Sequence, residues 1–466
     1  MANHKLIEQT VVFPSTPRTT TTFLPLTFLD LPFAGPVYVE RLFFYHFPHS
    51  TTHFSKTTLP SLKHSLSLTL QHFFPLAGNL HCPLPPHKPF ILCTQNDSVT
   101  FTVIESSANF NHLSTNQHPK NLQDFNHLVP KLTEKTTFDD GNDIFIFPLL
   151  SLQVTVFPNH GLCIAIKYCH VMDDNCCNHL MKSWSFIHRK GDVVDFKSQP
   201  CFDRQVLRDP EGLEDLFLKG YYEKRKTWED NRLIGKTQSI EKHDEDCVKA
   251  IIVFGKEEIE GMKKWVLNEW KKKDQEIQAP QFLSKYVVTC AFVWVSLVKA
   301  MHRSNHNIDE KDEYFCFTGD CRDRLGYTIP EGYFGNCLAF NHATMKRRDV
   351  KGEDGFVNAV KVIEKAITEM KNEPLKDATK WEGSAKKIGE FGNLLFVRGS
   401  PKFNVYETDF GFGKPVKVEM MHSLKCMSIA ESGDREGGLE VGLAFKSEDY
   451  ECFSSVIQQG LQALKF

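Results

Sequence analysis

The sequence lacks the features that define several large protein classes. Its first twenty residues contain no apolar core of about 7–15 residues followed by a small-residue cleavage site, so no signal peptide is indicated. No apolar run reaches the roughly 20 residues that cross a membrane, since charges and three prolines interrupt 23–47 and the run 286–301 is too short. We therefore expect a cytoplasmic protein without a membrane span, in which residues 286–301 form a buried helix.

The sequence also lacks an excess of charge of either sign. It has 55 Lys+Arg against 58 Asp+Glu and a formal net charge of −3. A nucleic-acid-binding protein usually shows a basic excess or a basic stripe, so we expect no nucleic-acid partner.

Motifs for several kinds of chemistry are missing as well. The 14 cysteines include no CxxC pair, which argues against a zinc site or a redox dithiol and favours reduced thiols. His46, His49 and His53 lie in a loop without a clear fourth ligand, so we expect no metal. The GxSxG, GxxxxGK[ST] and strand-linked GxGxxG motifs are also absent, which removes the usual signals of serine hydrolases, P-loop proteins and dinucleotide-binding domains.

The residues that are present are typical of a large globular protein. Of the 466 residues, 41% are hydrophobic and 12% aromatic, enough for about two or three domains with substantial cores. Alternating apolar residues predict a β-hairpin over 150–168 with its turn at 158–161, and helical spacing begins at Cys177. Strands and helices that mix without strict βαβ alternation favour a mixed α/β or α+β fold.

The second half of the chain follows a polar region. Residues 190–244 carry turn formers and a charged run, and we expect them to cross between domains. Ser284 and Ser447 are placed to cap two helices. The remaining pattern predicts these elements: strands at 251–254 and 439–445, and helices at 257–270 and 356–370.

An HxxxD spacing occurs at the junction between the predicted hairpin and the helix after it. His170 ends the strand on the same face as Ile166 and Tyr168, and Asp174 follows four residues later. A second match begins at His188, at the polar end of the helix, where a solvent-facing or dipole-compensating role is expected. Taken alone, His170 fits a structural role as well as a catalytic one.

A second motif lies near the C-terminus, where residues 409–415 read DFGFGKP. Its glycines flank an aromatic residue, and Asp409 can bond to its own loop amides, so we expect a structured loop. Together with the upstream HxxxD, it resembles the paired signatures of the BAHD family of plant acyl-CoA-dependent acyltransferases, HxxxD and DFGWG. The resemblance covers nearly the whole chain through four further segments in the family's order: LPLTFLD at 24–30, LQHFFPLAGNL at 70–80, DCRDRL at 320–325 and YFGNC at 333–337.

The resemblance implies a fold and a reaction. The fold is like that of chloramphenicol acetyltransferase, with two similar-sized domains of mixed sheets flanked by helices, here 1–190 and 221–466, joined by a long crossover loop over 191–220. YFGNC is similar to the pentapeptide of the clade that acylates flavonoid and anthocyanin glycosides, commonly with malonyl-CoA. The implied reaction is direct transfer of a malonyl or related acyl group from CoA to a sugar hydroxyl within a ternary complex. The protein is expected to be a monomer that uses acyl-CoA as cosubstrate and no metal or other cofactor.

The resemblance also implies roles for particular residues. His170 is the general base, because an imidazole can take the hydroxyl proton near neutral pH. Asp174 supports the motif by pairing with Arg322 of the DCR segment, and an orienting contact with the imidazole is the alternative. Asp409 organises its own loop and the domain interface.

The binding site for CoA is less sharply marked. Ser284 and Lys285 start the buried helix, where backbone amides and the helix dipole favour phosphate. Lys263 and Lys264 are the candidate phosphate partners on the preceding predicted helix.

Two positions depart from the family's pattern. Asn175 replaces the glycine of HxxxDG, and Asn tolerates the positive φ that we expect there. Phe412 replaces the tryptophan of DFGWG and removes an indole N–H donor. Three functions stay open: transfer from malonyl-CoA, transfer from a hydroxycinnamoyl-CoA to a similar acceptor, and binding of a metabolite by a non-catalytic relative. The sequence does not identify the acceptor hydroxyl.

Overall fold

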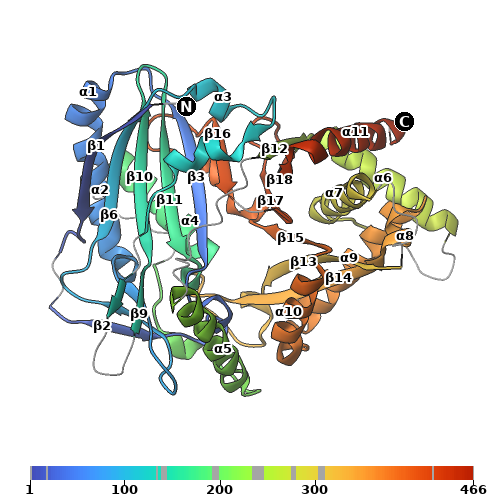
Figure 1. Cartoon of the computed structure of the whole chain (residues 1–466), viewed down its shortest axis with the longest axis horizontal. Coiled ribbons are helices and arrows are strands. Elements are labelled where there is room, and N and C mark those ends of the chain that lie inside the picture. Colours follow the sequence, from blue (N-terminus) through green and yellow to red (C-terminus); the bar gives the residue numbers. More distant parts are fainter. Residues whose placement is uncertain are drawn as a thin grey trace.

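The chain folds around two large β-sheets and one smaller sheet, with helices packed on the sheets (Figure 1). The computed structural model describes the following residues: 3–16, 19–132, 135–137, 144–191, 199–233, 246–273, 280–302, 310–421 and 424–464. Parallel and antiparallel pairings occur in the same sheet, as where β10 pairs in parallel with β6 and antiparallel with β11. The predicted mixed α/β fold is confirmed.

The first large sheet has six strands and contains the predicted hairpin. In spatial order they are β1 (His4–Val12), β6 (Val99–Ser106), β10 (Leu150–Phe157), β11 (Gly161–Cys169), β3 (Tyr38–His46) and β16 (Lys417–Met421). The β10–β11 register pairs Leu150 with Tyr168 and Phe157 with Gly161, and Asn159 takes a positive φ of 65° in the turn. The hairpin prediction is confirmed, and all residues of both strands are buried.

The second large sheet has seven strands. In order they are β14 (Leu338–Lys346), β13 (Asp312–Asp320), β15 (Leu394–Arg398), β17 (Cys426–Glu431), β18 (Leu439–Lys446), β12 (Cys247–Phe254) and β7 (Lys120–Asn121). The smaller sheet contains β2 (Thr22–Pro25), β5 (Phe90–Cys93), β4 (Asn79–Cys82), β9 (Ile144–Pro148) and β8 (Lys135–Thr137). Each large sheet takes one edge strand from the other half of the chain: β16 pairs with β3, and β7 pairs with β12.

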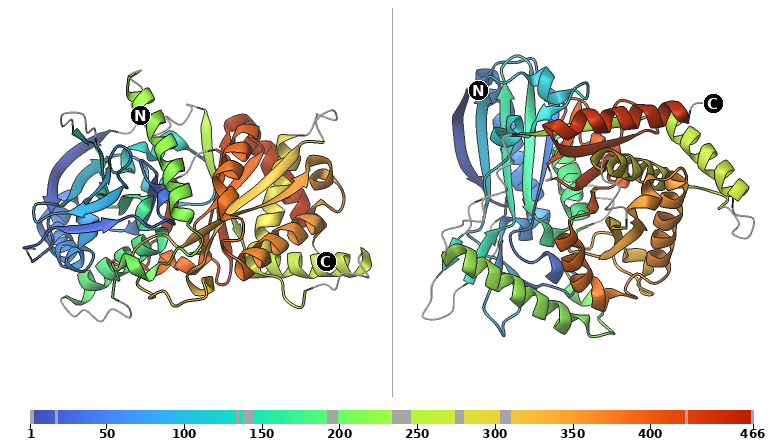
Figure 2. Two further views of the ribbon diagram at one scale, coloured as in Figure 1. Left: turned by 90° about the horizontal axis from the view of Figure 1, so that it is seen from below. Right: turned by 45° about the vertical axis from the view of Figure 1, so that its right-hand side comes forward.

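The helices pack mainly against the sheet of their own half (Figures 1 and 2). In the N-terminal half they are α1 (Thr51–His53), α2 (Leu59–His72), α3 (Phe110–Ser114) and α4 (Asp174–Lys190). The later helices are α5 (Leu213–Leu233), α6 (Lys256–Lys273), α7 (Lys285–Met301), α8 (Arg347–Lys351), α9 (Gly355–Asn372), α10 (Trp381–Phe391) and α11 (Ser447–Ala463). Helices α2 and α4 contact each other, and α7 contacts α6, α9 and α11.

The predictions for the second half are largely confirmed. Helix α7 is the predicted buried helix, and the Ser284 hydroxyl caps it by accepting a hydrogen bond from the Tyr286 amide at 3.2 Å. Ser447 is instead the first residue of α11, and its hydroxyl donates to the Asp246 carbonyl at 3.2 Å. Among the described helices, none combines the length and the apolar character that a membrane crossing requires.

The predicted crossover contains a long helix rather than only a loop. Helix α5 covers the charged run and continues past the predicted boundary at residue 220. It buries Phe217 and Tyr221 and contacts the 3₁₀ turns η1 (Leu31–Phe33) and η9 (Ala378–Lys380), one from each half. The predicted domain limits therefore stay a prediction, and residues 192–198 of the crossover lie outside the described residues.

A buried network of charges joins the two large sheets. Lys417 on β16 pairs with Glu440 on β18 at 2.7 Å, and Lys249 on β12 pairs with Glu419 on β16 at 2.8 Å. All four side chains are at least 95% buried. Breaking a buried pair strands an uncompensated charge, so this network makes the contact between the sheets specific.

We expect Lys417→Met to lower the free energy of unfolding by about 3 kcal/mol or more, because Glu440 stays buried without its ammonium partner. Denaturant unfolding measures this loss. Lys226→Met, which removes the exposed pair with Glu223, is the matched control and should cost less than about 1 kcal/mol. The double variant Lys417→Met with Glu440→Gln should recover part of the loss. Equal losses of stability in Lys417→Met and in the control Lys226→Met would contradict this account.

Candidate active site

His170 lies directly after β11, in the 3₁₀ turn η5 (His170–Met172). Its backbone N–H donates to the Val37 carbonyl at 2.8 Å, and its carbonyl accepts from the Asn336 side-chain amide at 3.0 Å. The imidazole stacks on the Phe33 ring at 4.2 Å with an interplanar angle of 8°. Within the described part of the chain its buried Nδ1 has no hydrogen-bond partner. Backbone contacts and stacking therefore position the ring without engaging this nitrogen.

The two carboxylates after His170 have different partners. Arg322 forms an ion pair with Asp173, not with Asp174, and the predicted Arg322–Asp174 pair is wrong. Arg322 also bonds to Asp320 and to the Gly335 carbonyl, both at 3.0 Å. The reason is local backbone geometry, since Asp173 has φ 64° and ψ 147° and lies just before α4, whereas Asp174 is the first residue of that helix.

The same geometry corrects the expectation for Asn175. The positive φ of this turn falls on Asp173, and Asn175 is an ordinary helical residue of α4. The replacement of glycine by asparagine therefore does not strain the motif at that position. A non-glycine residue with positive φ costs backbone energy, and the buried ion pair with Arg322 offsets that cost.

Asp174 lies beside His170 and belongs to a separate polar cluster. Its carboxylate accepts a hydrogen bond from the buried Tyr168 hydroxyl. Burial opposes ionisation, but the charges of His170 and Arg41 and the Tyr168 hydroxyl outweigh it, so the pKa of Asp174 is lowered. Burial instead raises the pKa of Asp173, against the effect of Arg322. No hydrogen bond joins Asp174 to the imidazole among the described residues, so its effect on His170 is electrostatic.

A buried carboxylate connects the motifs that are distant in sequence. Asp30, from LPLTFLD, accepts bonds from the backbone and side-chain amides of Asn336 at 2.8 and 3.1 Å. It also accepts from Thr27 and lies 3.5 Å from Arg204, whose guanidinium bonds the Phe334 carbonyl and the Tyr333 hydroxyl. The LPLTFLD and YFGNC segments and the crossover therefore meet at Asp30, and Asn336 connects this network to the backbone of His170.

Several members of this site carry no motif that the sequence analysis used. Arg204 stands in the polar crossover, Tyr168 was visible only as a strand residue, and Arg41 only as a charge that interrupts the apolar run 23–47. The signal that points to Tyr168 is its place two residues before His170 on the same strand face. Arg204 has no comparable signal, because its partners come from both halves of the folded chain.

The DFGFG loop packs against the end of α4. Asp409 accepts a hydrogen bond from the Gly411 amide at 2.7 Å and lies 3.4 Å from Arg189. Gly411 and Gly413 have φ values of 92° and 87°, which side chains rarely adopt. Phe412 stands edge-on to Tyr45 at 5.9 Å, so a ring contact occupies the tryptophan position without an N–H donor.

Of the two roles expected for His188 at the end of α4, the solvent-facing one is wrong. Its Nδ1 lies 2.7 Å from the carbonyl of Phe410, and its ring contacts Phe410 and Phe412. Burial lowers the pKa of His188, against the effect of the Phe410 carbonyl. The second HxxxD match therefore marks the contact between α4 and the DFGFG loop.

The predicted CoA residues lie on α6 and α7 rather than in the polar network around His170. Ser284 caps α7, and the Lys285 ammonium lies 3.5 Å from the Gly437 carbonyl. Lys263 and Lys264 are on α6, where Lys263 pairs with Glu260 at 2.8 Å and lies 5.0 Å from the Phe282 ring centroid. Their role toward CoA stays a prediction.

The fold and this site define a protein with two large sheets, one in each half of the chain, and a histidine where the two halves meet. The family model of the Transferase family matches residues 4–459. A coumaroyl-CoA:anthocyanidin 3-O-glucoside-6''-O-coumaroyltransferase of Arabidopsis thaliana is 34% identical over 98% of this chain and 97% of the relative. A malonyl-coenzyme A:anthocyanin 3-O-glucoside-6''-O-malonyltransferase of Dahlia pinnata is 34% identical over 94% of each.

A solved structure has the same fold. Vinorine synthase superimposes with a TM-score of 0.68 at 16% identity and covers 97% of this chain and 96% of its own. A relative named as a BAHD acyltransferase from Arabidopsis thaliana is 31% identical over 95% of each chain. The chain belongs to this family, the BAHD acyltransferases, which confirms the resemblance found in the sequence.

We expect Asp173→Asn to destabilise the protein by about 3 kcal/mol and to lower activity with it, because the buried Arg322 loses its buried carboxylate partner and keeps only the half-exposed Asp320. Asn tolerates the positive φ, so the variant tests the charge alone. Asp320→Asn is the control, since its half-exposed carboxylate bonds to the same Arg322 and should matter by less than about 1 kcal/mol. Thermal unfolding measures the stability of both variants. Similar losses of stability in Asp173→Asn and Asp320→Asn would refute the assignment of Asp173 as the main partner of Arg322.

We expect His188 to make stability depend on pH. Because its folded-state pKa lies below the ordinary value of 6.5, the unfolded chain binds the proton first, and stability is lost as pH falls below that value. His188→Gln keeps an N–H donor for the Phe410 carbonyl but does not titrate. Its Tm should therefore fall less than that of the wild type between about pH 7 and pH 5. Parallel Tm profiles for the two proteins would show that His188 does not contribute.

Proposed function

We propose that this protein transfers an acyl group from acyl-CoA to a sugar hydroxyl of a phenolic or flavonoid glycoside, with His170 as general base. The observation that carries the proposal is the buried network that holds His170 between the two halves while its Nδ1 is unengaged. The similar Arabidopsis and Dahlia proteins are named for transfer to anthocyanidin and anthocyanin glucosides, which supports this class of acceptor.

The reaction follows from the chemistry of the imidazole. His170 takes the proton of the sugar hydroxyl while the oxygen attacks the thioester carbonyl, which gives a tetrahedral oxyanion. When this intermediate collapses, the C–S bond breaks and the imidazolium returns its proton to the CoA thiolate. Acyl transfer is direct, so no covalent acyl-enzyme forms.

Asp174 and the Asp30 network support this step differently. An ionised Asp174 stabilises the imidazolium that forms during attack, and the lowered pKa of Asp174 keeps it ionised. The Asp30–Asn336 contact holds the His170 backbone in place. Asp409 shapes the DFGFG loop, and Ser284, Lys285, Lys263 and Lys264 remain the proposed contacts for CoA.

We propose malonyl as the donor group, with a hydroxycinnamoyl group as the second candidate. The two relatives at 34% identity are named for one donor each, so identity does not choose between them. We further propose a cytoplasmic monomer that needs no metal or other cofactor besides the acyl-CoA cosubstrate. A non-catalytic, metabolite-binding role is disfavoured by the histidine base, since simple binding does not need one.

We expect His170→Ala to lower CoA release by about 10²–10⁴-fold without loss of fold, because the general base is removed and the His170 backbone contacts remain. The assay incubates wild type and variant with a panel of acyl-CoAs and phenolic glucosides, follows free thiol and identifies products by mass. Thermal unfolding checks the fold, and His188→Gln controls for the loss of a histidine elsewhere. Turnover by a folded His170→Ala protein at the wild-type rate would refute the proposal.

A further inference from the structure

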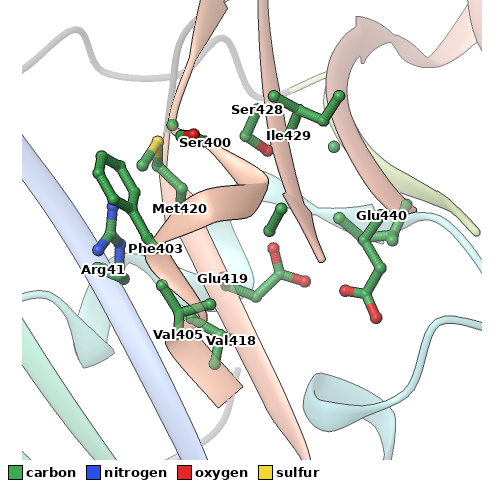
Figure 3. Close-up of a pocket in the computed structure, with 14 residues that line it drawn as sticks. Arg41, Ser400, Phe403, Val405, Val418, Glu419, Met420, Ser428, Ile429 and Glu440 are labelled. Carbon is green, nitrogen blue, oxygen red and sulfur yellow. The ribbon is translucent and has the colours of Figure 1, made fainter. Parts of the chain in front are cut away.

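The cavity between the two large sheets is separate from the candidate active site. It has a volume of about 30 Å³, with Arg41 and Phe403 on one side and Glu440 on the opposite side (Figure 3). Neither His170 nor Phe33 is among the residues that line it. Contacts with neighbouring residues, rather than this cavity, therefore determine how the His170 imidazole is oriented.

The Phe33 ring is the aromatic neighbour of the His170 imidazole. The two rings stack with their centroids 4.2 Å apart and their planes 8° apart. Within the described ranges, the hydrogen bonds of His170 all belong to its backbone, and Nδ1 is buried without a partner. The torsion χ2 of a histidine has a broad energy profile, so a ring without such a bond can turn about it. A parallel ring restricts this rotation, because an imidazole that leaves the stack loses the contact between the ring faces.

The segment that carries Phe33 is fixed on its N-terminal side by Asp30. The Asp30 carboxylate accepts hydrogen bonds from the amide and the hydroxyl of Thr27 at 2.9 and 2.7 Å. The Phe33 amide donates to the Asp30 carbonyl at 2.9 Å in the turn η1. Because the same carboxylate bonds Asn336, which holds the His170 carbonyl, Asp30 fixes both the stacking ring and the backbone of the histidine.

Helix α5 of the crossover holds the same segment from its other side. The Lys224 ammonium donates a hydrogen bond to the Pro32 carbonyl at 3.0 Å. Gly35 has a φ of 115°, and a Cβ atom added to it would lie 2.2 Å from the Trp228 ring, so this part of the helix packs directly on the backbone. Phe33 lies between these two contacts in the sequence. Its ring therefore has little freedom to move away from the imidazole.

We propose that Phe33 is a positioning residue for the general base, whose ring holds the His170 imidazole in the orientation that faces the acceptor hydroxyl. This inference rests on the proposed acyl transfer and adds a residue that lies outside the motif segments. A general base acts only when its nitrogen is within hydrogen-bond reach of the proton that it takes. An imidazole that turns freely spends less time in this geometry, so the loss of the stack lowers kcat. Because Phe33 acts through His170, KM changes less than kcat.

Phe33→Leu and Phe33→Tyr separate the ring contact from apolar bulk. We expect Phe33→Leu to lower kcat by about 10-fold or more and to change KM for acyl-CoA and glucoside by less than about threefold, because leucine fills space without a ring face. Phe33→Tyr keeps the ring and should retain most of the wild-type kcat. Phe23→Leu is the matched control, since Phe23 is exposed and its ring contacts Phe90, so its kcat should equal that of the wild type.

Two kinetic results would overturn the proposal. Wild-type kcat in a folded Phe33→Leu protein would show that the base does not depend on the stack. A rise in KM for the glucoside at unchanged kcat would assign Phe33 to acceptor binding instead. Thermal unfolding checks the fold, and Phe33→Met is the second ringless variant if Phe33→Leu does not fold.

A spectroscopic measurement keeps this inference separate from the proposed function. If the wild type turned over no acyl-CoA with any glucoside, the proposed function would fail, whereas the orientation of the imidazole is measurable without turnover. The ring current of a phenyl face shifts the proton resonances of a stacked imidazole upfield. In isotope-labelled protein, the Hε1 signal of His170 is identified by its absence in His170→Ala. This signal should move downfield in Phe33→Leu and keep its position in Phe33→Tyr; an unmoved signal in Phe33→Leu would overturn the positioning role.

Discussion

The contact between Asp30 and Asn336 is the interaction on which the geometry of the site depends. Asp30 comes from the start of the chain and Asn336 from the second half, and both are fully buried. The Asn336 side-chain amide bonds both the Asp30 carboxylate and the His170 carbonyl. A buried carboxylate needs all of these donors, so the two halves have to meet in one arrangement. The position of His170 is thus a property of the whole fold rather than of the HxxxD segment.

The sequence predicted those elements whose signals are local. The β10–β11 hairpin follows from strand periodicity and a turn, and the α7 helix follows from helical periodicity and an N-cap. The signals for each element lie within about 20 residues of sequence. The two edge strands that come from the other half of the chain, β7 and β16, were not predictable in this way. Strand β7 has only two residues, and β16 pairs with a strand nearly 400 positions earlier. Lysines at 249 and 417 look like solvent-facing residues until the two large sheets pack together and bury them.

In the candidate site, too, the sequence predicted the features that have local signals and missed those that depend on distant contacts. Motifs identified His170, Asp409 and the segment that contains Arg322, but they did not give the partner of Arg322. That choice depends on a single positive φ at Asp173, which points two neighbouring carboxylates toward different surroundings. Sequence spacing cannot show such a change, since Asp173 and Asp174 are chemically identical. Arg204 was missed for a related reason, because its partners belong to segments that only the folded chain brings together.

The neighbouring residues Asp173 and Asp174 have different roles, one structural and the other electrostatic. Asp173 pairs directly with Arg322, and this buried pair fixes the turn. Asp174 has a neutral hydroxyl as its hydrogen-bond donor, so its negative charge stays available to a nearby imidazolium. In the proposed reaction, when His170 takes a proton from the acceptor, that charge stabilises the cation without a hydrogen bond that would hold the ring in one tautomer. In that proposal His170 then returns the proton to the leaving thiolate, because among the described residues neither Asp173 nor Asp174 forms a hydrogen bond with the imidazole.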